Sequence, residues 1–228
     1  MKRKIQILLW LYWLFAMLIS YQYSTTGNLP VWIVMPPLLL GAWFYDFTKH
    51  RNDNWLRIAG IGAVFFLFLT DFFSLFTDFS GPTPLRIIVQ CFSVSSYLFY
   101  TGGYFFKYPF QSGYLKKYPI FWAMFLGCQV MIIGYLMQNI KSNETISSLF
   151  YTGAVTAFYV SIVNTRTKIP ESLWWRLMVG VYSLVISEIF VLLNDFKPSV
   201  FSLLLYYIGD CIILTTTALI IRRDRDNL

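Results

Sequence analysis

The sequence is poor in charge, since only 13% of its 228 residues are Asp, Glu, Lys or Arg, against about 25% in soluble domains. It contains three Cys and a single His, which is too few for a disulfide framework or a His/Cys metal site. It also lacks a P-loop, a Gly-x-Gly-x-x-Gly fingerprint and a Gly-x-Ser-x-Gly elbow. These absences disfavour a soluble domain, a secreted disulfide module, a zinc or di-iron enzyme, and nucleotide or nucleophile-elbow chemistry.

Apolar and aromatic side chains are present in excess, at 57% and 20% of the residues, with a mean hydropathy of +0.57. Because roughly 20 apolar residues cross about 30 Å of hydrocarbon as a helix, runs of that length predict membrane spans. We count eight such runs, near 5–23, 29–46, 55–76, 84–106, 118–138, 146–163, 174–194 and 199–221. We therefore expect an all-α polytopic membrane protein, a single transmembrane domain over 1–228.

The second run is the shortest candidate and contains Pro36-Pro37. Proline removes an amide donor and kinks a spanning helix, which is tolerated where neighbours satisfy the freed carbonyls. Eight spans are the favoured count, and seven are the alternative if this run does not cross.

Basic residues indicate the orientation, because cytoplasmic loops hold the excess of Lys and Arg. With eight spans and an inner N-terminus, fifteen of the 18 basic residues fall on the inner side, and only Arg86, Lys141 and Lys197 fall on the outer side. Both termini are therefore predicted to be cytoplasmic, and we expect the chain to lie in the plasma (inner) membrane of a bacterium. The same distribution accounts for the net charge of +7 through anionic membrane lipids, without nucleic acid.

An internal repeat appears at an offset of 117 residues, where Thr70–Phe79 aligns with Ser187–Phe196. A hydroxyl residue precedes an acid in both copies, and Phe, Leu, Asp and Phe then recur at the same positions. Each copy ends a predicted span. The repeat predicts two parallel four-helix halves, about 1–110 and 111–228, related by an axis along the membrane normal.

Three acids lie well inside predicted spans: Asp71, Glu188 and Asp210. A carboxylate at mid-bilayer costs about 2.5–3.5 kcal/mol on insertion scales, so these side chains are expected to face the bundle interior. If Asp71 and Glu188 meet, one can act as an acid and the other as a base. The alternative is structural, with the acids bonded across helices to hydroxyls such as those of Tyr97 and Tyr207.

Around these acids the sequence resembles the YhhN family of integral membrane proteins, whose characterised members are lysoplasmalogenases. Thr70-Asp71 and the apolar stretch that follows are similar to the family's first motif, Gly-Asp. Ser187-Glu188 and its apolar stretch are similar to the second, Ser-Asp. The resemblance extends over nearly the whole chain in topology, and in residues over four short segments.

The other two segments lie on later spans. Tyr97 precedes Tyr100 where the family has a His three residues before a Tyr, and Tyr206-Tyr207-Ile208-Gly209-Asp210 is similar to its Tyr-Tyr-x-x-Gln pattern. This chain thus carries Thr70 for Gly, Glu188 for Asp, Tyr97 for His and Asp210 for Gln. The phenol at position 97 removes a group that titrates near neutrality.

The resemblance implies hydrolysis of the vinyl ether bond of a lysoplasmalogen, giving a fatty aldehyde and a glycerophospho-headgroup. It implies Asp71 and Glu188 as the catalytic acid and base, and a lysophospholipid or another single-chain lipid as the partner. The residues implied to bind the substrate are Tyr97, Tyr100, Tyr207 and Asp210. No metal or organic cofactor is required.

Two other functions fit the same residues. Paired membrane acids at a repeat interface also serve as coupling sites in proton-coupled transporters, and a non-catalytic lipid-binding relative could keep the fold without the chemistry. A retinal photoreceptor is disfavoured, because no Lys lies within the last spans to form a Schiff base. The sequence assigns no oligomeric state.

Overall fold

The chain is seen here as a computed structural model, which describes residues 3–49, 54–77, 84–109, 142–193 and 198–226 and a few isolated helical positions between 119 and 134. The regular structure of these residues is entirely helical. The elements are α1 (Arg3–Thr26), the 3₁₀ turn η1 (Val31–Val34), α2 (Met35–Thr48), α3 (Asn54–Ser74), α4 (Pro84–Lys107), α7 (Ser142–Val163), α8 (Glu171–Leu193) and α9 (Val200–Asp226).

Five helical segments within the described residues are long and apolar enough to cross a membrane. They are Gln6–Thr26, Val31–Thr48, Trp55–Ser74, Glu171–Val191 and Val200–Arg223. In α7 the apolar part is shorter, Leu149–Val163. The predicted all-helical fold is thus confirmed for the described residues, and five of the helical segments have the length and apolar composition of membrane spans. The run predicted at 118–138 lies almost wholly outside the described residues.

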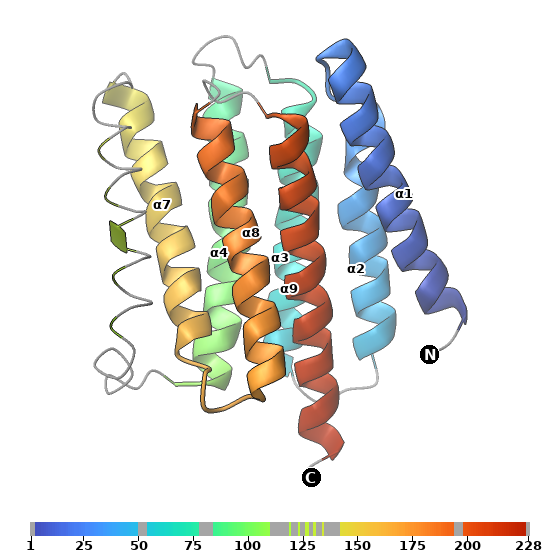
Figure 1. Ribbon diagram of the computed structural model, residues 1–228, viewed down its shortest axis with the longest axis vertical. Helices are drawn as coiled ribbons and strands as arrows, with labels where there is room; N and C mark the ends of the chain where they lie inside the picture. Colours follow the sequence, from blue (N-terminus) through green and yellow to red (C-terminus); the bar gives the residue numbers. More distant parts are fainter. Residues whose placement is uncertain are drawn as a thin grey trace.

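The helices stand side by side, roughly along the long axis of the molecule, and the two chain termini lie at the same end of the bundle (Figure 1). The C-terminal helix α9 packs against α1, α2, α3 and α8, and it is the most deeply buried of the five candidate spans. It therefore brings the first and last parts of the chain together. Any polar side chain on the inner face of α9 is enclosed by other helices.

The run predicted at 29–46 starts with η1 and continues as α2. Pro36 and Pro37 are buried and occupy the first turn of α2, where backbone amides have no acceptor within the helix. The prolines therefore cost no helical hydrogen bond. Val31–Thr48 remains one continuous candidate span.

Tyrosine hydroxyls connect helices that are far apart in the sequence. The Tyr12 hydroxyl of α1 donates to the Tyr207 carbonyl oxygen of α9 at 2.5 Å. The hydroxyls of Tyr104 on α4 and Thr217 on α9 are 2.8 Å apart. In a membrane the hydrophobic effect does not drive helices together, because the lipid is itself apolar. Interhelical hydrogen bonds of this kind each stabilise the packing by about 0.6–2 kcal/mol.

The helices that carry the two repeat copies occupy similar settings. The first copy ends α3, which packs extensively against the following helix α4, and the second ends α8, which packs in the same way against α9. Consecutive helices of each pair run in opposite directions (Figure 1). The last residues of each copy, 78–79 and 194–196, lie outside the described residues.

Close packing of α8 against α9 depends on two glycines. A Cβ atom placed on Gly209 would lie 2.9 Å from the Gly180 carbonyl oxygen and 2.7 Å from Leu184. Small residues let helix backbones approach in membranes, where packing replaces the hydrophobic effect as the driving force. Gly209 stands one residue before Asp210, so this approach also fixes the depth and direction of an acid-bearing turn.

We predict that Gly209→Ala lowers the free energy of unfolding by about 1–3 kcal/mol, because the backbone of α8 cannot move without disturbing the pair. Gly153→Ala is the matched control. A Cβ on Gly153 meets nothing within 4 Å, so alanine there is expected to leave stability unchanged or to raise it by up to about 1 kcal/mol. Thermal unfolding in detergent measures both. Equal melting temperatures for the two variants would contradict the tight α8–α9 contact.

Candidate functional site

The three acids predicted inside spans come from three different helices. Asp71 lies on α3, Glu188 on α8 and Asp210 on α9, each within a candidate membrane span. Asp71 and Asp210 are each only 5% exposed, whereas the Glu188 side chain is half-buried. Within the described residues none of the three forms an ion pair. The carboxyl groups are thus held inside the bundle without a compensating cation.

Asp210 occupies the centre of this carboxyl cluster, which we define as Asp71, Glu188 and Asp210. It interacts electrostatically with both Asp71 and Glu188. The direct pairing of Asp71 and Glu188 therefore stays a prediction, and Asp210 joins them as a third acid that interacts with both.

A small cavity separates Asp71 from Asp210. Its volume is about 10 Å³, which is about the space that one water molecule requires. The cavity does not have room for a lipid headgroup. Its walls come from α1, α2, α3 and α9, and they include Tyr12, Pro36, Pro37, Leu40, Val64, Leu67, Tyr206 and Tyr207.

Polar atoms around this cavity lack partners within the described chain. Oδ2 of Asp71 and the hydroxyl oxygens of Tyr206 and Tyr207 are buried and make no hydrogen bond. The Tyr206 hydroxyl lies close enough to the Asp71 carboxyl to interact with it, although the pair does not adopt hydrogen-bond geometry. Because a buried polar atom without a partner costs about 1–3 kcal/mol, a concentration of such atoms indicates a functional site.

Glu188 faces a different set of hydroxyls, at the junction of α4, α7 and α8. The Tyr151 hydroxyl of α7 interacts with the Glu188 carboxyl, and it lies 3.3 Å from the hydroxyl of Tyr97 on α4. On the preceding residue, the Ser187 hydroxyl donates to the Ser202 carbonyl oxygen at 2.7 Å. This bond ties α8 to α9 next to the acid. Glu188 thus sits at the end of a short row of tyrosine hydroxyls.

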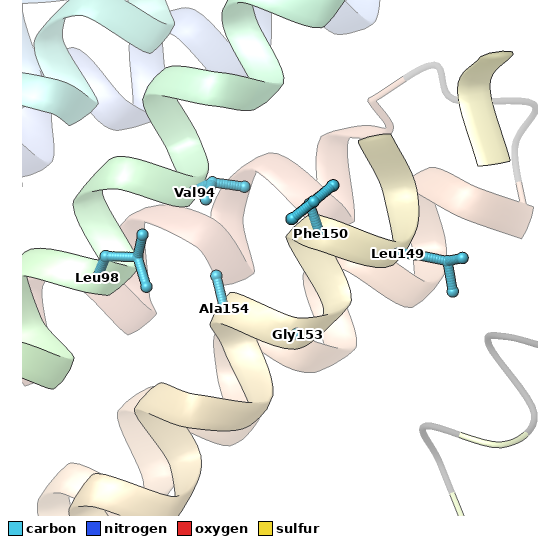
Figure 2. A pocket seen from close by; sticks show the side chains of 6 residues that line it. All are labelled: Val94, Leu98, Leu149, Phe150, Gly153 and Ala154. Carbon is cyan, nitrogen blue, oxygen red and sulfur yellow. The ribbon is translucent and has the colours of Figure 1, made fainter. Parts of the chain in front are cut away.

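An apolar groove lies between α4 and α7, beside this row. Figure 2 shows Val94 and Leu98 on one wall and Phe150, Gly153 and Ala154 on the other. The groove measures about 430 Å³ and is open along one side. Its wall residues neighbour Tyr97 and Tyr151 in the sequence, so the groove lies near the tyrosine hydroxyls that interact with Glu188.

The other predicted substrate-binding residues lie within the same region. Tyr100 is 1% exposed; its ring stacks on Phe158 at 5.2 Å, and its hydroxyl faces the charge of Asp210. Tyr207 and Asp210 both line the small cavity. The structure brings all six predicted site residues into one part of the bundle.

Sequence reasoning missed Tyr151 and Tyr12. Tyr151 reaches Glu188 from α7, and Tyr12 lines the cavity from α1. Neither residue belongs to a repeat or to a motif, and both reach the acids only through helix packing. Tyrosine is frequent in this chain, at 16 residues, so residue type alone gives no signal that could have selected them.

Among the described residues, no group of three or more His, Cys, Asp or Glu side chains is placed to hold a metal ion. Cys91 and Cys211 are free cysteines, and Cys128 and His50 lie outside the described residues. The described side chains around the acids contribute carboxyl and phenol groups.

Comparisons of this chain with protein families, curated proteins and solved structures find no match. The resemblance to the YhhN family therefore remains a resemblance in a few short segments. Any assignment of function must depend on the geometry of the carboxyl cluster.

Asp210→Asn is predicted to raise the free energy of unfolding by about 1 kcal/mol or more, because it keeps the side-chain shape and removes a buried ionisable carboxyl that lies near two other acids. Asp46→Asn is the control. Asp46 pairs with Lys49 at the exposed end of α2, and a surface pair contributes about 0–1 kcal/mol. Thermal unfolding in detergent compares the variants. A clear loss of stability in Asp210→Asn would show that the carboxyl is structural.

Proposed function

We propose that the chain is an intramembrane hydrolase that cleaves the vinyl ether bond of a lysoplasmalogen, or of a similar single-chain lipid, by carboxyl acid–base catalysis. The observation that supports this most is the carboxyl cluster, in which the half-buried Glu188 interacts with tyrosine hydroxyls near an apolar groove and two enclosed acids line a water-sized cavity. Acid and base groups with different surroundings are what a proton-transfer reaction requires.

The reaction divides into two proton transfers. The vinyl ether carbon that lies beta to the oxygen takes a proton from a carboxyl group, which leaves an oxocarbenium ion. Water then adds to the carbon next to the oxygen and gives up a proton to a carboxylate of the cluster. The resulting hemiacetal collapses to a fatty aldehyde, and the glycerophospho-group leaves with a hydroxyl. We assign Glu188 as the acid that protonates carbon, and Asp71, through Asp210, as the group that orients the water.

Access from the membrane favours a substrate with one tail. The α4–α7 groove is lined by Val94, Leu98, Phe150, Gly153 and Ala154, so it can receive an acyl or alkenyl chain by apolar contact. Tyr97 and Tyr151 lie between the groove and the cluster and offer hydroxyls to an ether oxygen. A chain in the groove would bring its polar end toward Glu188.

The same proposal includes the membrane topology. We infer eight spans in two parallel four-helix halves, with both termini in the cytoplasm of a bacterium. Support comes from the two termini lying at one end of the bundle (Figure 1), from the excess of Lys and Arg in the segments of that end, and from the equivalent packing of α3 on α4 and α8 on α9.

One observation favours a proton-coupled transporter as the second candidate. The cavity between Asp71 and Asp210 has room for a water molecule and for no larger substrate. The acids and tyrosines together form a row from Asp71 through Asp210 and Glu188 to Tyr151 and Tyr97. Such a row can conduct protons without any bond being cleaved.

Purified protein incubated with lysoplasmalogen is expected to release fatty aldehyde, and Asp71→Asn or Glu188→Gln should each lower kcat by about 100-fold or more, because general acid–base groups contribute factors of that size. Asp46→Asn, an acid outside the carboxyl cluster, is expected to retain the activity. The measurement is aldehyde formation coupled to an alcohol dehydrogenase.

Release of aldehyde at equal rates by the wild type and both variants would contradict the assigned roles. Proton uptake by proteoliposomes without release of aldehyde would contradict the hydrolase proposal and favour a proton-coupled transporter. Lipid binding without hydrolysis and without proton uptake would favour a non-catalytic lipid-binding protein.

The groove makes a separate prediction about tail length. Gly153→Phe would fill it, so KM for long-tailed lysoplasmalogen should rise at least several-fold, while kcat for a short-tailed analogue should change little, because the tail contributes binding and not chemistry. Gly102→Phe is the control, since Gly102 on α4 also faces open space and does not line the groove. Identical KM values for Gly153→Phe and the wild type would exclude the groove as the tail site.

A further inference from the structure

A second pocket lies at the end of the bundle that carries the chain termini, far along the helices from the carboxyl cluster. It is formed by the turn between α7 and α8 and by the last part of α9, and it measures about 300 Å³. This volume is at the lower end of the range for small-molecule sites, about 300–1,000 Å³. Polar side chains form its rim, from Thr167, Lys168 and Arg223, and apolar side chains form its floor, from Ile169, Leu173 and Ile220.

The rim carries two positive charges, and no acid among the described side chains pairs with either of them. Within the described part of the chain, neither Lys168 nor Arg223 makes an ion pair. Glu171, the acid that follows Lys168 at the start of α8, is bound instead by Arg166 at 3.0 Å. The Arg166 guanidinium also stacks on Trp174 at 4.2 Å, which keeps that pair in place. The pocket therefore has an electropositive rim.

Lys168 is held in a defined position. Its Nζ donates to the Pro109 carbonyl oxygen at 2.5 Å, and partial burial lowers the pKa of this amine, because desolvation disfavours the ammonium form. A bound anion would offset that cost and accept the remaining N–H groups. The start of α8 at Glu171 adds the positive end of a helix dipole beside Lys168.

The floor distinguishes this pocket from a site for a small inorganic anion. Ile220 is 1% and Ile169 is 8% exposed, so an apolar surface lies directly behind the cations. The candidate span of α8 begins at Glu171 and that of α9 ends at Arg223, which puts the pocket at the level where headgroups meet hydrocarbon. A ligand that joins an anionic group to an apolar chain fits both parts.

We propose that this pocket binds the phosphate group of an anionic phospholipid from the leaflet at this end of the bundle, with the phosphate between Lys168 and Arg223 and the glycerol and first methylenes over Ile169, Leu173 and Ile220. The site is independent of the proposed hydrolase activity. It would hold the α7–α8 turn against α9 and so stabilise the bundle.

The test is the melting temperature of the detergent-purified protein titrated with short-chain phosphatidylglycerol, with phosphatidylcholine of the same chain length, and with inorganic phosphate. A ligand that binds only the folded state raises the melting temperature in proportion to its affinity. We expect a saturable rise with phosphatidylglycerol, a smaller one with phosphatidylcholine, and an affinity at least tenfold lower in the double variant Lys168→Gln, Arg223→Gln. Lys168→Arg, which keeps the charge, should retain binding.

Arg222→Gln is the matched control. It removes one charge from the neighbouring residue of α9, but the Arg222 guanidinium lies over the Phe47 ring of α2, 5.9 Å from its centroid, and not at the pocket. An equal loss of binding in Arg222→Gln, or an unchanged affinity in the double variant, would overturn the site. Inorganic phosphate could raise the melting temperature as much as the lipid does, with the rise lost in the double variant. That result would support a phosphate site but would overturn the proposal that a lipid supplies the phosphate. If the double variant does not fold, Arg223→Gln alone carries the comparison, because this side chain is exposed.

Discussion

A carboxyl group inside an apolar helical bundle pairs with a cation or takes up a proton; left charged and unpaired, it costs a few kcal/mol of stability. This chain places three of them together, on α3, α8 and α9, and the described residues provide no ion pair for any of them. The helix packing is arranged around this constraint. Gly209 lets α9 approach α8 next to Asp210, and the buried prolines of α2 close the cavity on the side of Asp71.

The surroundings of the three acids differ, and this difference would let one carboxyl act as an acid and another as a base. Asp71 and Asp210 are enclosed around a space for one water molecule, whereas Glu188 is half-buried beside tyrosine hydroxyls and an open apolar groove. In the proposed reaction Glu188 must be reached by a lipid, so it has to be partly accessible. Asp71 must position a water molecule, so it has to be enclosed. Asp210 connects the two, so a change in the charge of one outer acid is transmitted to the other.

Hydrophobic run length was sufficient to predict the all-helical fold, the five candidate spans and the burial of Asp71, Asp210 and Glu188, because each follows from the cost of polar groups in hydrocarbon. The repeat also identified Asp71 and Glu188 as related. Their distance from each other depends instead on how α3 and α8 pack around α9, and residue spacing contains no such information. For the same reason Tyr151 and Tyr12 were missed, and Pro36 and Pro37 became the start of α2 rather than a kink.

The most direct test of the account is a set of double-mutant cycles on the free energy of unfolding, with Asp71→Asn, Asp210→Asn and Glu188→Gln combined in pairs. If Asp210 connects the other two acids, the cycles that include it should show coupling energies of about 0.5–3 kcal/mol, and the Asp71–Glu188 cycle should be close to additive. Additivity in all three cycles, or strong coupling between Asp71 and Glu188 alone, would contradict a carboxyl cluster centred on Asp210.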